Sequence, residues 1–166
     1  MHRNLYVDDY IRFWADFPMT GANPFCYTNW IIHSAYQRYL LNADSAFLLS
    51  VRDGLARMWE QTHSMHWQEF VDKENVTHSC YYQTDGADAM EVSISGDGCR
   101  PTIASCMFGD AQVLSYMGAL NNKNETMRRV FQERANAAKD VVLNLHWNAD
   151  ICSFAVIPIT SHKEQD

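Results

Sequence analysis

The sequence predicts an all-α protein made of two consecutive antiparallel αα-hairpins. Four long segments repeat apolar residues at three- and four-residue steps, which is the period of an amphipathic helix. Short polar turns join the segments within each pair, and such turns make the joined helices antiparallel neighbours. The longer segment 81–102 separates the two pairs. At 166 residues the chain can bury one real core, so we expect residues 1–166 to form a single domain.

The first pair follows a short aromatic segment, Asp8 to Phe17, which is compatible with a helix and is ended by "PMTGANPF". A helix is predicted from about Tyr27 to Leu41, and its mostly apolar stripe holds Trp30, Ile31, Ser34, Ala35, Arg38 and Leu41. "NADS" ends it, and Asp44 or Ser45 can cap the next helix through a side-chain oxygen. That second helix fades into the polar stretch "VDKENVTHS" and carries Phe47, Leu48, Val51, Leu55, Met58 and Trp59.

The second pair is predicted to begin at Pro101, with Thr102 as N-cap. The stripe of its first helix consists of Ile103, Met107, Ala111, Leu114 and Met117. After "NNKNE", Asn124 can cap a last helix with the stripe Met127, Val130, Phe131, Ala135, Ala138 and Val142. The stretch "LHWNADICSFAVIP" then stops helix formation and gives a short β-like run.

The composition is that of a globular protein, with 47% hydrophobic and 20% charged residues. The net charge of −7 and the absence of basic runs argue against nucleic-acid binding. No apolar stretch approaches the ~20 residues that span a bilayer, so no membrane partner is predicted. "MHRNLYVDDYIRFW" has no secretory signal core, whereas two glycosylation sequons, at Asn75 and Asn124, fit a secreted protein. Secreted and cytoplasmic locations both remain open.

The cysteines and histidines follow no metal-site pattern, so no metal and no cofactor is predicted. Five cysteines occur, without a C-x-x-C pair. Cys106 lies within a helical pattern and reads as a small buried residue. Cys80 and Cys99 flank the 81–102 segment, and their spacing leaves open whether a disulfide joins them.

Segment 81–102 concentrates acidic residues, and Asp85, Asp88 and Glu91 lie three residues apart. In a helical turn this spacing places the three carboxylates on one face, where mutual repulsion raises the pKa of at least one of them. A carboxyl group with a raised pKa can serve as a general acid near neutral pH. A solvated acidic loop is the alternative, while the ligand pattern of a calcium loop is absent.

The stretch "DAMEVSISGDGCRPTIASCMFGDAQVL" resembles a signature of the mannosylglycerate-hydrolase-like glycoside hydrolase domains, which belong to the six-hairpin (α/α)6 toroid class. The matching residues are Met90, Glu91, Ser93, Gly98, Arg100, Pro101, Thr102, Gly109, Asp110 and Ala111. "WIIHSAYQRYLLNADSAFL" is similar to the preceding hairpin, so the resemblance covers about Tyr27 to Pro158. The chain departs from the pattern at Ala104 and Cys106, and "DGADAME" holds an extra residue or two.

The resemblance implies an inverting attack on a glycosidic bond of an oligosaccharide or small glycoside, with Glu91 as the general acid. It also implies that Asp85, Asp88, Tyr82, Gln83 and Arg100 bind sugar hydroxyls and that Trp30 can stack on a sugar ring. The second carboxylate of this class comes from a later hairpin than the two seen here. The chain is therefore expected to be part of a partial toroid and to be inactive alone.

Structural roles compete with these functional ones. Arg100 can instead anchor the loop through an ion pair with Asp97 or Asp110, Trp30 can pack in the core, and Asp110 is expected to be structural. As a whole, the chain can instead be a non-catalytic helical domain that binds carbohydrate or a protein, or whose acidic loop binds a basic partner. Apolar helix faces left uncovered would then favour self-association.

Overall fold

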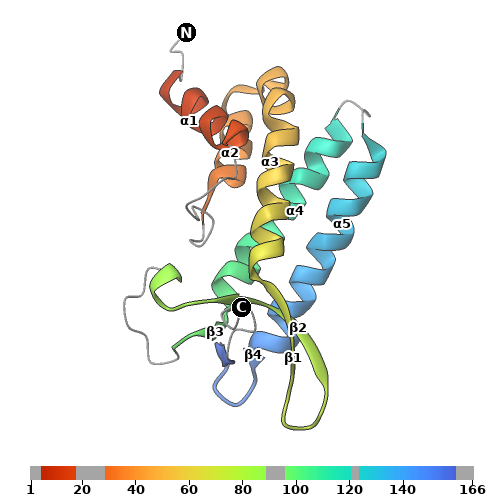
Figure 1. Cartoon of the computed structure of the whole chain (residues 1–166). Coiled ribbons are helices and arrows are strands. Elements are labelled where there is room, and N and C mark those ends of the chain that lie inside the picture. Colours follow the sequence, from red (N-terminus) through yellow and green to blue (C-terminus); the bar gives the residue numbers. More distant parts are fainter. Residues whose placement is uncertain (1–4, 18–28, 89–95, 121–123, 160–166) are drawn as a thin grey trace.

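The structure is a computed structural model of the chain and describes residues 5–17, 29–88, 96–120 and 124–159. Figure 1 shows helices standing side by side, with short strands gathered at one end of them. The elements in order are α1 (Leu5–Asp16), α2 (Ile31–Asn42), α3 (Ser45–His66), β1 (Trp67–Val71), β2 (Thr77–Gln83), the 3-10 turn η1 (Gly86–Asp88), β3 (Gly98–Cys99), α4 (Pro101–Ala119), α5 (Glu125–Asp140), the π-helical turn η3 (Val141–His146), β4 (Trp147–Asn148), β5 (Ser153–Phe154) and β6 (Ile157–Pro158).

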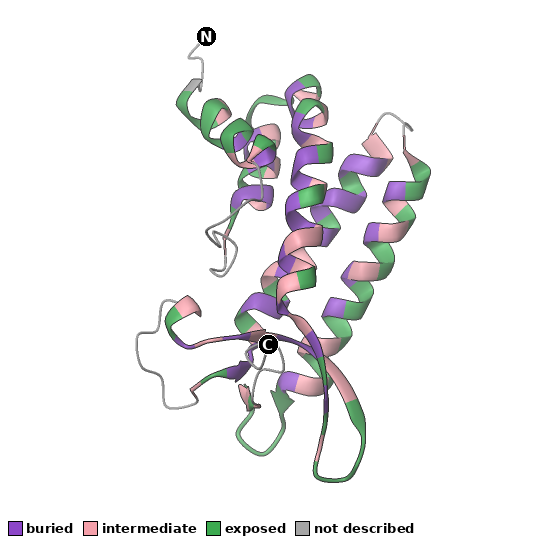
Figure 2. Cartoon of the chain, in the orientation of Figure 1, coloured by how far each residue is buried: buried purple, intermediate pink, exposed green. Residues whose placement is uncertain are grey.

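Helix α4 lies at the centre of the core and packs against α2, α3 and α5. The stripe predicted for it is confirmed, because all five of its residues, from Ile103 to Met117, are buried. Figure 2 shows the buried residues gathered on the helix faces that turn toward one another. Helix α3 contributes its whole predicted stripe to the same core, and α5 contributes Met127, Phe131, Ala135 and Ala138 of its own. In this core Trp59 and Phe131 meet edge to face at 5.5 Å between ring centroids.

Two of the three predicted helix caps are confirmed. The Asp44 carboxylate accepts a hydrogen bond from the Phe47 N–H at 3.0 Å, and the Asn124 side chain accepts one from the Met127 N–H at 2.9 Å. The prediction for Thr102 was wrong. Arg100 occupies the N-cap position of α4, and the Thr102 hydroxyl donates to the Asp88 carboxylate at 3.0 Å.

The stripe predicted for α2 is only partly buried. Ile31 and Ala35 lie in the core, but Trp30 is 61% and Leu41 84% exposed. Arg38 is buried because its guanidinium forms ion pairs with Asp8 and Asp44 and lies over the Phe47 ring. Arg38 therefore takes the place of an apolar residue in the contact between α2, α1 and the start of α3.

A small antiparallel sheet, with strand order β1-β2-β3-β6, was not predicted. The protein is therefore mostly helical with an added sheet, rather than all-α. The chain passes from His66, the last residue of α3, directly into β1, and β1 pairs with β2 in the register Trp67↔Tyr81. The β-like run predicted after α5 does form strands, and one of them, β6, pairs with β3 to complete the sheet. The first residues of the 81–102 segment thus belong to a strand.

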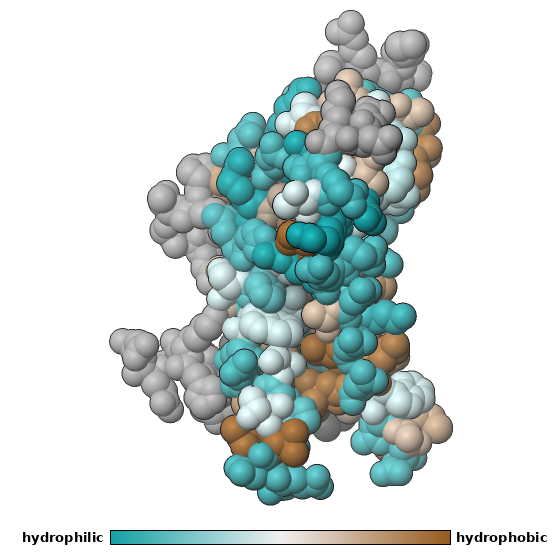
Figure 3. Space-filling view, turned by 90° about the vertical axis from the view of Figure 1, so that its right-hand side faces the viewer, coloured by the Kyte–Doolittle hydropathy of each residue, from teal (hydrophilic) through white to brown (hydrophobic). Residues whose placement is uncertain are grey.

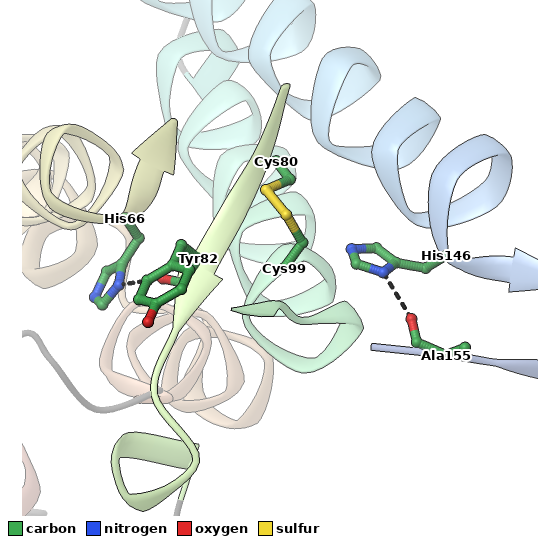
Figure 4. The surroundings of a disulfide bond; sticks show 6 residues. All are labelled: His66, Cys80, Tyr82, Cys99, His146 and Ala155. Carbon is green, nitrogen blue, oxygen red and sulfur yellow. Dashed lines mark hydrogen bonds between the residues drawn. A yellow bond between two sulfur atoms is a disulfide. The ribbon is translucent and has the colours of Figure 1, made fainter. Parts of the chain in front are cut away.

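A disulfide joins Cys80 in β2 to Cys99 in β3, a pairing that the sequence left open. Both cysteines are fully buried, and Figure 4 shows the bond between the two strands, with His66 on one side and His146 on the other. The neighbouring Gly98 allows β6 to approach closely, since a Cβ at this position would clash with the Ile157 carbonyl. The disulfide therefore closes the base of the loop between β2 and β3.

None of the helices in the described ranges combines the length and the apolar character that a bilayer span requires.

Removing the disulfide should destabilise the fold. Cys80→Ala combined with Cys99→Ala should lower the free energy of unfolding by about 3 kcal/mol, because the loop that the bond closes gains conformational freedom in the unfolded chain. Urea denaturation under oxidising conditions measures this difference. Cys152→Ser, at an exposed free cysteine, is the control and should change stability by less than about 0.5 kcal/mol. Equal stability of the double variant and the unmodified chain would contradict the expectation.

Candidate functional site

The loop between β2 and β3 is held by the guanidinium of Arg100, whose side chain is 3% exposed. Its Nη1 donates to Asp85 Oδ1 at 2.9 Å and to the Gly96 carbonyl at 2.8 Å. Its Nε donates to Asp88 Oδ2 at 3.0 Å, and the Thr102 hydroxyl donates to the same oxygen at 3.0 Å. We call Arg100, Asp85, Asp88, Gly96 and Thr102 the Arg100 cluster. It joins the turn η1, the stretch just before β3 and the first turn of α4.

Further hydrogen bonds fix the turn η1 itself. The Asp85 N–H donates to Asp97 Oδ1 at 2.7 Å, and the Thr84 hydroxyl accepts from the Ala87 N–H at 3.3 Å. The buried Gln83 side chain donates to the Ala87 carbonyl at 3.2 Å. Behind the turn, the Arg100 N–H donates to the Tyr81 carbonyl at 3.0 Å, which ties the start of α4 to β2. Asp85 and Asp88 are therefore held both by their side chains and by their backbone.

Three of the predicted site residues thus lie together, and their contacts correct one expectation. Arg100 does form a loop-anchoring ion pair, but with Asp85 and Asp88 rather than with Asp97 or Asp110. The positive guanidinium between Asp85 and Asp88 offsets the repulsion that their spacing predicts. Since Arg100 occupies one oxygen of each carboxylate, these contacts favour a positioning role for both acids.

Glu91, the predicted general acid, lies outside the described residues. The described residues on either side of it are both bound by Arg100, namely Asp88 before the segment 89–95 and Gly96 after it. The spatial relation between these two ends of the segment is therefore set by one side chain.

The remaining predicted residues lie on β2 and α2. Gln83 is 1% exposed and belongs to the base of the loop, so its amide serves the turn η1. The Tyr82 side chain is partly exposed, while its carbonyl binds His66 Nδ1 at 2.8 Å (Figure 4). Trp30 is 61% exposed at the start of α2, with the His33 ring 6.2 Å away, which fits a stacking surface better than core packing.

Asp110 in α4 is a buried carboxyl group that connects the two hairpins. Burial raises its pKa to about 8, while a hydrogen bond from the backbone of His33 works in the opposite direction. The N-cap residue of α2, Trp30, supplies no side-chain cap. Asp110 therefore satisfies an N–H of the first turn of α2 from a neighbouring helix. This supports the structural role expected for Asp110. The sequence signal for that role is the position of Asp110 three residues after Met107, on the buried stripe of α4.

A small cavity of about 10 Å³ adjoins Asp110, with Asn29, Thr62 and Cys106 among its lining residues. Its volume matches a single water molecule, so no sugar can reach Asp110 through it. Burial, and then the charges of Asp110 and Asp88, raise the pKa of Cys106 to about 12. Cys106 therefore stays a neutral thiol between the Arg100 cluster and the first turn of α2, and it has no thiolate for nucleophilic chemistry.

Across the described ranges, no group of three or more His, Cys, Asp or Glu side chains could hold a metal ion.

No protein-family model and no curated protein sequence matches this chain. A solved structure described as a sialidase is similar, with 30% sequence identity and a TM-score of 0.73. The likeness covers 90% of this chain but only 14% of the sialidase chain. A sialidase is a glycoside hydrolase, so this chain resembles a segment of one glycoside hydrolase in both fold and sequence.

Arg100→Met should destabilise the protein by about 3 kcal/mol or more. The carboxylates of Asp85 and Asp88 are only 13% and 7% exposed, and the substitution removes the cation that pairs with both of them. Thermal and urea denaturation measure the loss. Arg52→Met is the matched control, because Arg52 pairs with the exposed Asp53 and such a pair contributes at most about 1 kcal/mol. Similar losses in the two variants would show that the buried ion pairs of Arg100 stabilise the protein no more than an exposed pair does.

The raised pKa of Asp110 predicts a pH-dependent stability. Between pH 3.8 and about 8 the unfolded chain has released this proton and the folded chain still holds it, so the free energy of unfolding falls as pH rises. The slope from this group is up to about 1.4 kcal/mol per pH unit. Asp110→Asn should remove that slope while keeping an acceptor for the His33 N–H.

Denaturation series from pH 4 to 8 test this expectation, with the exposed Asp140→Asn as control. Unchanged slopes in Asp110→Asn would contradict it.

Proposed function

We propose that this chain forms part of a glycoside hydrolase domain in which Glu91 is the general acid. The observation that carries the proposal is the Arg100 cluster, because it holds both ends of the segment that contains Glu91. A general acid must stay within hydrogen-bond reach of the leaving oxygen, so a loop with fixed ends suits this role. The likeness to a segment of a sialidase supports the hydrolase class.

The reaction proposed is an inverting one, as in the mannosylglycerate-hydrolase-like domains of the (α/α)6 class. Glu91 protonates the glycosidic oxygen as the bond breaks, and a second carboxylate activates water on the opposite face of the sugar. The two carboxyl groups of such a pair lie about 6.5–9.5 Å apart. We place the second carboxylate on another part of a longer polypeptide, in keeping with the 14% of the sialidase chain that is matched.

Within this proposal, Asp85, Asp88 and Arg100 position the loop, and Trp30 offers a stacking surface for a sugar ring. Tyr82 is the remaining candidate for direct contact with sugar hydroxyls, since its side chain is partly exposed and lies beside the base of the loop. The buried Gln83 acts through the backbone of η1 rather than on substrate. Asp110 contributes by holding the first turn of α2, next to Trp30.

A second candidate function is a non-catalytic domain that binds carbohydrate or a protein. It is favoured by apolar residues exposed on the helices, among them Tyr6 at 92% and Leu41 at 84%. Such surface is typically covered by a partner, and self-association of the chain is one form that this cover can take. The following experiment separates the two functions, because a non-catalytic domain contributes no acid to turnover.

Glu91→Gln, made in the longer polypeptide that contains this chain, should lower kcat for glycosides with poor leaving groups by at least about 100-fold. The amide has no proton to give to the leaving oxygen. Glycosides with an activated leaving group, such as 2,4-dinitrophenyl glycosides, need no protonation and should keep most of their turnover. Steady-state kinetics on both substrate types measure the difference.

Glu74→Gln, in the exposed turn between β1 and β2, is the control and should leave both rates unchanged. Full activity of Glu91→Gln on the poor leaving group would remove Glu91 from the reaction.

A further inference from the structure

A second site candidate lies between α3, the β1–β2 hairpin and α5, away from the Arg100 cluster. This groove is open to solvent, has a volume of about 450 Å³ and is lined by Trp59, His63, Trp67, Tyr81, Val130, Glu133, Arg134 and Ala137. We call it the α3–α5 groove. Its volume falls within the range of about 300–1,000 Å³ that is usual for small-molecule sites.

One wall of the groove is a rigid stack of rings. The His63 ring lies between Trp59, at 4.9 Å between centroids, and Trp67, at 5.1 Å. Tyr81 meets Trp67 edge to face at 4.9 Å, and its hydroxyl hydrogen-bonds with His63 Nδ1 at 3.0 Å. Trp59 and Tyr81 are each 1% exposed and form the base of the wall, whereas His63 and Trp67 are partly exposed.

The opposite wall comes from α5 and is charged. Glu133 is exposed there, and the Arg134 guanidinium lies 4.9 Å from the centroid of the Trp59 ring. Arg134 also forms an ion pair with Glu60 of α3, and this pair holds the guanidinium near the Trp59 ring. The groove thus presents the partly exposed His63 and Trp67 rings on one side and charged hydrogen-bonding groups of both signs on the other.

We propose that the α3–α5 groove binds a neutral pyranose unit of a saccharide. A pyranose ring has an apolar face of C–H groups that packs on aromatic rings, and a rim of hydroxyls that both donate and accept hydrogen bonds. The partly exposed Trp67 ring at the end of the stack matches that face, and Glu133 and Arg134 match the rim. Every residue of this site comes from α3, β1, β2 or α5, so the inference goes beyond the proposed function and does not depend on Glu91.

The charges of the groove disfavour two other occupants. An anionic ligand would meet Glu133 and Glu60 as well as Arg134, on a chain whose net charge is −7. An apolar segment of another chain would bury the Glu133 carboxylate without giving it a cation or hydrogen-bond donor, and burying an unpaired charge is costly.

Figure 3 looks onto the side of α5 and shows hydrophilic residues over its upper part, with apolar residues gathered near the sheet end.

Ligand-observed saturation-transfer NMR of the 166-residue chain tests the proposal, with cellobiose and maltose as probes. Cellobiose offers all-equatorial rings joined by a β-linkage, and maltose the same rings joined by an α-linkage. We expect saturable binding of at least one of them, with Kd in the millimolar range. Quenching of tryptophan fluorescence should give the same Kd, since Trp59 and Trp67 both lie in the aromatic wall.

Two variants assign the binding to the groove. Glu133→Ala should raise Kd by about threefold to tenfold, the range that corresponds to the loss of one hydrogen bond. Gln132→Ala is the matched control, because Gln132 is the exposed neighbour on α5 that hydrogen-bonds with Asn136 instead. Trp67→Ala should abolish binding, and circular dichroism checks that this variant still folds. If it unfolds, Glu133→Ala still tests the proposal, because it changes only an exposed side chain.

Several outcomes would overturn the proposal. One is that neither sugar binds saturably, and another is that Glu133→Ala leaves Kd unchanged. A third is a dimer, seen by sedimentation, that Trp67→Ala dissociates, because a second copy of the chain would then fill the groove. A Kd that responds to Trp30→Ala but not to the groove variants would move the sugar to the start of α2. That result would overturn the groove site while supporting the site in the proposed function.

Discussion

The buried guanidinium of Arg100 fixes how the loop before α4 meets the rest of the protein. A charge that is 3% exposed needs nearby partners, and here two carboxylates and a carbonyl accept hydrogen bonds from its Nε and Nη1. These acceptors come from both sides of the segment 89–95, so one planar group sets the spacing of its two ends. Because Asp85 and Asp88 are themselves nearly buried, losing Arg100 leaves two carboxylates without their cation.

A disulfide and backbone hydrogen bonds also constrain strands β2 and β3, on either side of the same loop. The Cys80–Cys99 disulfide and the β2–β3 ladder join the two sides of the loop at its base, and the Arg100 N–H binds the Tyr81 carbonyl just above them. The covalent bond acts mainly by limiting the unfolded chain, whereas the ion pairs distinguish among arrangements of the folded loop. Together they tie β2, β3 and the first turn of α4 to one another, on both sides of the segment 89–95.

The helices could be predicted from the sequence because their buried residues repeat locally, as Ile103, Met107 and Ala111 do along α4. The sheet could not, since no glycine or proline separates His66 from Trp67 and the pairing partner of β1 lies beyond a turn. The partners of Arg100 were missed because they too depend on strand pairing, which local sequence patterns do not show. Asp97 is near Arg100 in sequence, whereas Asp85 is brought to the guanidinium by the β2–β3 pairing. Trp30 and Leu41 show that residues of an apolar stripe can also lie on the surface, since no element within the described ranges buries them.

Strand β2 connects the candidate acid loop to the α3–α5 groove. Side chains alternate between the two faces of a strand, so Tyr81 points toward Trp67 and His63 while its neighbour Cys80 carries the disulfide. The carbonyl of the same Tyr81 accepts the N–H of Arg100. Because Tyr81 lines the groove through its side chain and binds Arg100 through its carbonyl, the groove and the Arg100 cluster have a fixed relation to each other. A saccharide held in the groove would therefore sit at a constant distance from the Arg100 cluster.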